Sequence, residues 1–142
     1  IREAMPDIAP ERLLFYIGTT NQEHMLTYQQ ADLILDPFPH TGGVVCMEQL
    51  YMCVPMVTLY GTQPAGRTTS SVLTVIGKKD WIAHSHEEYI ETAVQLAGDT
   101  KQLKQCRKTL REEFLLSPVV KGYLEAVERS YREMWQIWVG HL

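Results

Sequence analysis

The sequence has few of the features that mark secreted, membrane or nucleic-acid-binding proteins. Its three cysteines are odd in number and lack metal-ligand spacing, which is typical of reduced thiols in a cytoplasmic protein. No apolar stretch approaches the length of a membrane span, and the N-terminus has no signal-peptide pattern. No run of lysines and arginines exceeds two residues, and the net charge is −4, so a nucleic-acid footprint is absent. We therefore expect a cytoplasmic protein with no membrane or nucleic-acid partner.

The length of the chain sets the domain count. A chain of 142 residues is long enough for one domain with its own core and too short for two ordinary domains. Its hydrophobic fraction of 45% and charged fraction of 21% are those of a globular protein. Because the first residue is Ile1 rather than methionine, we expect a piece of a longer protein in which residues 1–142 form a single domain.

Residues 36–48 form the most informative segment. An apolar run ends at Asp36, two prolines set a turn, and Gly42 and Gly43 precede apolar residues with helical spacing. This pattern predicts a strand, a tight loop and a helix N-terminus at the carboxyl edge of a parallel sheet. The free N–H groups and positive dipole end of such a helix attract phosphate, and glycine lets the backbone approach an anion closely. Two glycines before a helix also fit a plain left-handed turn, and Asp36 fits a turn former better than a catalytic group.

Strand patterns alternate with helix patterns along the first part of the chain. We expect four parallel strands, over residues 13–17, 33–35, 56–59 and 81–83. Crossover helices are expected between them, over about 22–30, 43–52 and 68–76. This order predicts an α/β fold with a Rossmann-like parallel sheet and crossover helices.

The rest of the chain has helical patterns throughout. Ser85, with a glutamate three residues later, predicts a capped helix start, and a second helix ends before Pro118. The final helix carries Tyr131, Trp135 and Trp138 at helical spacing, and we expect these aromatic residues to pack in the core. The fold should therefore end in long helices.

Motifs along nearly the whole chain, from about Ala9 to about Trp138, have the order and spacing of one known family. They are ADLILDPFPHTGG, EQLYMCVPMVTLYG, GRTTSSVL, LKQCRKTLREEFLLSP and LEAVERSYREMW. The chain thus resembles the C-terminal lobe of the O-GlcNAc transferase family, including SPINDLY-type and bacterial tetratricopeptide-linked relatives. The resemblance implies half of a GT-B glycosyltransferase, in which two Rossmann-like lobes hold a nucleotide sugar. The N-terminal lobe and the tetratricopeptide repeats match nothing in this sequence, so we expect them in a longer chain.

The resemblance also implies residues that hold the nucleoside. Thr19 and Asn21 lie in the loop whose counterpart contacts uracil, and His24 falls where members keep a histidine near the nucleotide. Glu48 matches an acidic residue that accepts hydrogen bonds from the ribose hydroxyls, and such charge-assisted bonds are about twice as strong as neutral ones. Without the resemblance, His24 would be an ordinary packed or surface histidine and Glu48 a solvated carboxylate.

The loop that matches the pyrophosphate site departs from the family pattern. Members usually carry threonines directly after the glycines, where this chain has Val44 and Val45 after Gly42 and Gly43. Backbone N–H groups can still hold a diphosphate, but each lost hydroxyl donor is worth about 1 kcal/mol, which predicts binding weakened several-fold to tens-fold. In the O-GlcNAc transferases proper a histidine lies beside these threonines, and here the one nearby is His40.

Three further positions bear on the candidate site. Arg67 precedes a run of hydroxyl residues and either contacts a phosphate or caps a helix. Cys53 stands where glycine is common in the family, and Cys46 is expected to be an inert small residue. The donor-binding candidates are Thr19, Asn21, His24, His40, Gly42, Gly43, Val44, Val45, Glu48 and Arg67.

The leading interpretation is the donor-binding lobe of an inverting glycosyltransferase. By the resemblance it would take a UDP-sugar, UDP-GlcNAc above all, and the full protein would modify Ser or Thr of protein acceptors. The resembled family works without a metal and the chain has no paired acids like a DxD motif, so we expect no metal and no other cofactor. No catalytic residue is assigned, and this chain alone should be inactive. The alternative is a non-catalytic nucleotide-binding or protein-interaction module, while a dinucleotide oxidoreductase is disfavoured because Gly-x-Gly-x-x-Gly is absent.

Overall fold

Three short parallel strands form the centre of the computed structural model, which describes residues 5–18 and 20–140. They are β1 (Ile34–Leu35), β2 (Met56–Leu59) and β3 (Ile82–Ala83), in the order β1-β2-β3. Ile34 pairs with Met56, and Thr58 pairs with Ile82. The first three residues of β2 are fully buried, as expected for a central parallel strand with helices on both faces. The α/β fold class and three of the four expected strands are confirmed.

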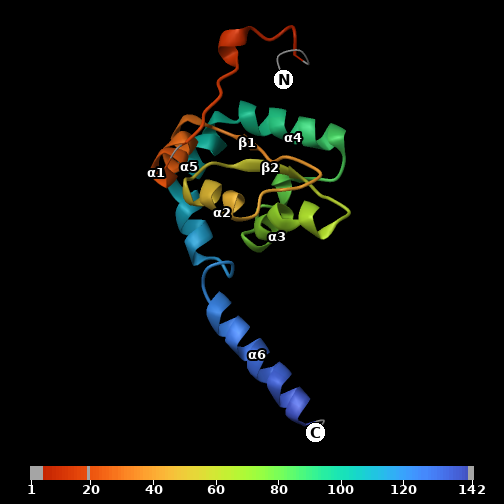
Figure 1. Ribbon diagram of the computed structural model, residues 1–142. Helices are drawn as coiled ribbons and strands as arrows, with labels where there is room; N and C mark the ends of the chain where they lie inside the picture. Colours follow the sequence, from red (N-terminus) through yellow and green to blue (C-terminus); the bar gives the residue numbers. More distant parts are fainter. Residues whose placement is uncertain (1–4, 19, 141–142) are drawn as a thin grey trace.

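The fourth expected strand, over residues 13–17, is wrong. These residues have no regular secondary structure, and they lead from the short 3-10 helix η2 (Pro10–Arg12) towards the body of the protein (Figure 1). Leu14 is 70% exposed and Ile17 is 91% exposed. Strand propensity reflects packing on a neighbouring sheet surface, and no described strand pairs with this segment, so its strand-forming side chains are not enough.

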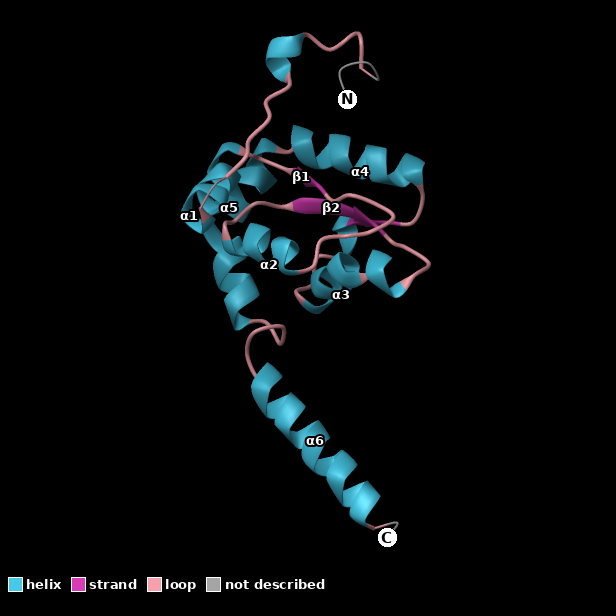
Figure 2. Ribbon diagram, viewed as in Figure 1, coloured by secondary structure: helices cyan, strands magenta, loops and turns pink. Residues whose placement is uncertain are grey.

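Two layers of helix cover the sheet (Figure 2). On one side lies α4 (His86–Gly98), and on the other lie α2 (Val44–Tyr51) and α3 (Thr68–Val75). The helix α1 (Asn21–Thr27) continues into the 3-10 turn η3 (Tyr28–Gln30), and α5 (Thr100–Leu116) packs against α2 and α4. Short 3-10 turns η4 (Pro64–Gly66) and η5 (Lys79–Trp81) precede α3 and β3. The expected helices are therefore present, within a few residues of their expected ends, although α1 follows no described strand and so is not a crossover between two strands.

Local sequence signals explain where these helices begin and end. Thr20 caps α1 in a reciprocal capping box with Glu23, and the Ser85 hydroxyl accepts the Glu88 N–H at the start of α4. Gly77, just after α3, has φ +77°, a left-handed conformation that favours glycine. Cys53, where glycine is common in the resembled family, also has a positive φ, +62°. The residue at that position, between α2 and β2, therefore adopts a left-handed backbone conformation.

The apolar core lies between the sheet and its helices. Leu50 of α2, Met56 and Val57 of β2, Leu73 of α3 and Leu110 of α5 are all fully buried. Truncating a leucine at such a position to alanine costs about 2–5 kcal/mol, so this cluster supplies a large share of the stability that holds the loops at the sheet edge.

The last helix, α6 (Tyr123–Val139), extends away from the body (Figure 1). None of its residues is buried. The rings of Trp135 and Trp138 lie against each other, with centroids 5.3 Å apart, and both are exposed. The expectation that Tyr131, Trp135 and Trp138 pack in the core is wrong, because helical spacing fixes which face is apolar but not what covers it. No described helix is both long and apolar enough to cross a membrane.

Candidate functional site

The loop between β1 and α2 is fastened by a buried carboxylate. Asp36 is 2% exposed and accepts hydrogen bonds from the Thr58 hydroxyl at 2.7 Å and from the Gly42 N–H at 3.0 Å. The Tyr89 hydroxyl of α4 donates to the Asp36 backbone carbonyl at 3.0 Å. Asp36 therefore does more than form a turn, because it ties the loop to β2 and α4.

A second set of contacts ties the same loop to the segment before α3. Both the N–H and the hydroxyl of Thr41 donate to the Ala65 carbonyl, at 3.2 and 3.0 Å, and the Thr69 hydroxyl donates to the Gly42 carbonyl at 3.0 Å. A Cβ on Gly66 would lie 2.8 Å from the Pro39 carbonyl oxygen, so only glycine allows this close approach. The loop is thereby held in one conformation from both sides.

The N-terminus of α2 remains open to an anion. Its cap residue is Gly43, which offers no side chain to the first helical turn, and that turn contains no acidic residue. The first N–H groups of a helix have no intrahelical acceptor, and the dipole places partial positive charge beside them. Val44 and Val45 are 68% and 42% exposed. Gly42 contributes close packing rather than a donor, because its N–H is bonded to Asp36 and a Cβ would lie 3.3 Å from that carboxylate.

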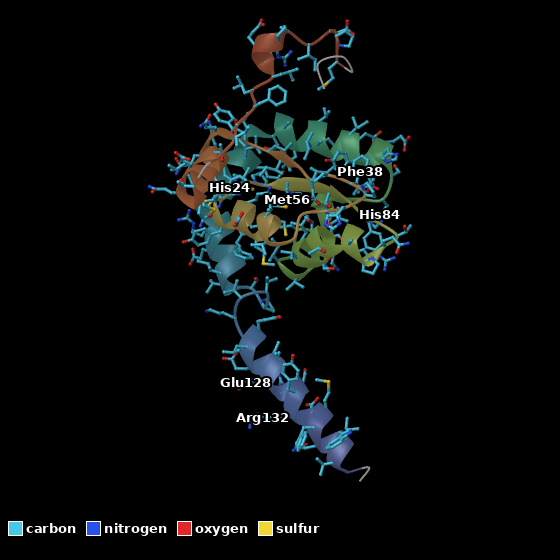
Figure 3. All side chains as sticks on the ribbon, viewed as in Figure 1. His24, Phe38, Met56, His84, Glu128 and Arg132 are labelled. Carbon is cyan, nitrogen blue, oxygen red and sulfur yellow. The ribbon has the colours of Figure 1, made fainter. Side chains whose placement is uncertain are left out.

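A polar cluster lies farther along the same helix. The Nε2 atom of His24, on α1 at one side of the body (Figure 3), lies 3.2 Å from Glu48 Oε2 and 2.9 Å from the Tyr28 hydroxyl oxygen. The His24 and Tyr28 rings meet edge to face with centroids 5.1 Å apart. Burial, and then the charge of Glu48, raises the pKa of Tyr28, so its hydroxyl keeps its proton at neutral pH. Gly18 permits the close approach of α1, because a Cβ there would lie 3.1 Å from the backbone nitrogen of His24.

The open N-terminus and the polar cluster lie at different positions along the axis of α2. Gly43 and Glu48 are five residues apart, which corresponds to about 7 Å along a helix axis. That separation is of the kind that lies between the phosphates and the ribose of a nucleoside diphosphate. The expectation that His24 and Glu48 lie together is confirmed by their contact, whereas their role in binding stays a prediction.

Comparison with known proteins assigns the chain to a family. The model of glycosyl transferase family 41 matches residues 2–126. The chain belongs to this family.

Curated relatives of the family 41 chain carry transferase names. It is 36% identical over 132 residues to a probable UDP-N-acetylglucosamine–peptide N-acetylglucosaminyltransferase SPINDLY of Solanum lycopersicum, a match that covers 91% of this chain and 14% of the relative. The SPINDLY of Hordeum vulgare is 39% identical over 117 residues, covering 81% and 12%. The corresponding transferase SEC of Arabidopsis thaliana is 31% identical over 137 residues, covering 94% and 14%. The chain therefore spans about one seventh of the length of these relatives.

A solved structure agrees with the fold. The O-GlcNAc transferase of Thermobaculum terrenum, in a K341M mutant form, superposes with a TM-score of 0.81 at 34% identity. The match covers 91% of this chain and 25% of that one. The family 41 chain thus has the fold of one part of a larger GT-B protein.

The remaining predicted donor-binding residues of the family 41 chain take no part in the His24–Glu48 contact or lie outside the described residues. Thr19 lies outside the described residues, and Asn21 is the exposed first residue of α1. His40 is exposed on the loop before Thr41. The Arg67 guanidinium donates to the carbonyls of Gly61 and Thr62, at 2.8 and 2.9 Å, and lies over the Tyr60 ring. In this structure Arg67 therefore organises its own loop rather than reaching the open end of α2.

The site is open rather than enclosed. A cavity of about 340 Å³ beside α1 is lined by Tyr16, Gly18 and Leu26, and an apolar one of about 640 Å³ is lined by Met47, Val72 and Val119. Neither cavity is lined by Gly42, Gly43 or Glu48. A helix N-terminus is a convex end, and enclosing it takes a second wall.

Cys46 lies in the first turn of α2, beside Gly43. Cys46 is fully buried, burial raises its pKa to about 11, and its thiol donates to the Gly43 carbonyl at 3.0 Å. It is therefore inert, as expected. Within residues 5–18 and 20–140, no three His, Cys, Asp or Glu side chains are grouped so that they could hold a metal ion. The expectation that the reaction needs no metal stays a prediction.

Two residues of the site were missed from the sequence. Tyr28 lies four positions after His24, and this i,i+4 spacing was the available signal. Asp36 was assigned only a turn, because its partners Thr58 and Tyr89 are 22 and 53 residues away along the chain. No local pattern links such distant positions.

Proposed function

We propose that this chain is the donor-binding part of a family 41 protein glycosyltransferase. The observation that carries the proposal is the His24–Glu48 contact one and a half turns along α2 from an open N-terminus, in a chain of this family. The relatives are named for transfer of N-acetylglucosamine from its UDP-sugar to peptides, which favours UDP-GlcNAc as donor and a protein Ser or Thr as acceptor.

In this arrangement the diphosphate lies at the N–H groups of Gly43, Val44 and Val45, and the ribose hydroxyls donate to Glu48. Negative charge develops on the β-phosphate as the bond to the sugar breaks. Oriented N–H donors and the helix dipole stabilise that charge without a metal ion. The acceptor hydroxyl attacks the anomeric carbon from the opposite face, with inversion.

The second wall of the cleft belongs to the rest of the protein in this proposal. The chain spans 14% of the SPINDLY relative of Solanum lycopersicum, which leaves room for an N-terminal lobe and tetratricopeptide repeats. The donor and acceptor need that lobe for alignment, so the chain alone has no transferase activity. We assign no catalytic base here, and we place the whole enzyme in the cytoplasm.

Titration with UDP, followed by backbone amide NMR, tests the proposal. We expect saturable shifts at Gly43, Val44 and Glu48, with a dissociation constant between about 10 µM and a few mM, because one wall and the hydroxyl donors are missing. Inorganic phosphate should move the Gly43 and Val44 signals but not that of Glu48.

The alternative is a non-catalytic interaction module, favoured by Val44 and Val45 in place of hydroxyl residues and by the exposed apolar face of α6. A folded protein with no shift at Gly43 in millimolar UDP would decide for this alternative.

A further inference from the structure

One nitrogen of His24 has two oxygen neighbours. Glu48 Oε2 lies 3.2 Å from Nε2, and the Tyr28 hydroxyl oxygen lies 2.9 Å from the same atom. A ring nitrogen carries either a hydrogen or a lone pair. With a hydrogen, Nε2 donates to the Glu48 carboxylate. With a lone pair, it accepts from the Tyr28 hydroxyl, and a carboxylate at 3.2 Å then repels it. The two contacts therefore favour opposite tautomers of His24.

The Tyr28 hydroxyl can serve either state. The residue is 9% exposed and keeps its proton at neutral pH, because burial raises its pKa. A hydrogen bond from the Gln49 side chain lowers the Tyr28 pKa, in smaller measure than burial raises it. The Gln49 Oε1 atom is buried and has no hydrogen-bond partner among the described residues. Rotation of the Gln49 amide group by about 180° would turn this oxygen towards the Tyr28 hydroxyl. The hydroxyl then has a second acceptor for its proton when Nε2 carries a hydrogen and cannot accept it.

We propose that Tyr28 is a positioning residue that sets the tautomer of His24, and that a vicinal diol bound at Glu48 reverses this tautomer. The inference rests on the proposed function, which assigns the ribose hydroxyls to Glu48. In the free protein the charge of Glu48 favours a hydrogen on Nε2, and Nδ1 carries the lone pair.

Binding changes the balance at Glu48. Two ribose hydroxyls donate to its carboxylate and compete with Nε2 for Oε2, which weakens the hydrogen bond from Nε2 to its charged acceptor. Nε2 gives its proton to water, Nδ1 takes one from water, and the ring charge is unchanged. Tyr28 then donates its O–H to the Nε2 lone pair. His24 becomes an Nδ1 donor only while the diol is bound, which suits a ligand that presents a carbonyl oxygen to the ring and penalises one that presents an amino group.

The test is imidazole nitrogen NMR on the ¹⁵N-histidine-labelled protein, at a pH about two units above the ordinary histidine pKa of about 6.5. A His24→Gln variant assigns the His24 signals among the five histidines. We expect protonated Nε2 in the free protein and protonated Nδ1 with saturating UDP. In Tyr28→Phe, which keeps the ring contact, Nε2 should stay protonated with UDP bound, and UDP affinity should fall about fivefold.

Tyr131→Phe on the exposed face of α6 is the matched control and should behave as wild type. Thermal unfolding checks that Tyr28→Phe is folded. An unchanged His24 tautomer on UDP binding, or a Tyr28→Phe variant that switches like wild type, overturns this inference alone. Absence of UDP binding to the wild-type protein overturns the proposed function and, with it, this inference.

Discussion

Replacement of Asp36 by asparagine separates a structural anchor from a simple turn former. Asparagine has nearly the same shape and forms turns before proline as well as aspartate does, so a turn role predicts almost no loss of stability. The structure instead gives Asp36 two hydrogen bonds in a site that is 2% exposed, one from Thr58 and one from the Gly42 N–H. A bond to a charged group contributes about 1.5–3 kcal/mol, and a neutral bond about 0.5–1.5 kcal/mol. Neutralising two such bonds should therefore cost about 2–3 kcal/mol.

Urea unfolding measures this loss. With a slope of about 1–3 kcal/mol per molar for a small protein, the midpoint of Asp36→Asn should fall by about 1 M or more. Asp32→Asn is the matched control: its side chain is 84% exposed and 3.7 Å from Arg107, so its change should stay within about 0.5 kcal/mol. Equal, small effects of the two substitutions would refute the anchoring role of Asp36.

Other changes probe separate features of the molecule. Cys53→Gly should raise the free energy of unfolding by about 1 kcal/mol in urea titrations, because φ is +62° at that position, and a loss of stability would contradict this. Val44→Thr should tighten UDP binding several-fold by calorimetry, whereas unchanged affinity would place the diphosphate elsewhere. The Lys78 ammonium lies 2.6 Å from the Glu113 carboxylate and lowers the pKa of Glu113 in the folded protein. The ionised Glu113 therefore stabilises the fold at pH values above its unfolded pKa, and this stabilisation is lost as the pH falls through the lower, folded pKa. Glu113→Gln should thus cost a few tenths of a kcal/mol at pH 7 and nothing by pH 2, and an equal cost at both would show that the ion pair is not responsible.

Helices with local signals were predictable from the sequence. Ser85 and Gly77 act within one turn of their own positions, so their caps can be recognised without tertiary structure. The strands β1, β2 and β3 were predictable for a similar reason, since a short apolar run between turns is typical of a buried strand. Residues 13–17 form a similar apolar run but have no described strand to pair with, and the run alone could not reveal that.

The site was predictable in part. The glycines and Glu48 stand in one continuous segment, so the position of the glycines just before α2 and of Glu48 on it followed from the local pattern. The contact of His24 with Glu48 joins residues 24 positions apart and came from the family resemblance rather than from any local pattern. The fastening of the loop by Asp36 could not be read from the chain, because its partners lie on β2 and α4.

The most direct test of the central claim compares the effect of Glu48→Ala on UDP with its effect on 2′-deoxy-UDP, both by calorimetry. If Glu48 holds the ribose hydroxyls, the substitution should weaken UDP by about 1–3 kcal/mol through loss of charge-assisted bonds, and the deoxy analogue clearly less. Glu91→Ala, on the exposed surface of α4, should change neither affinity. Equal losses for both nucleotides, or none for UDP, would contradict the account.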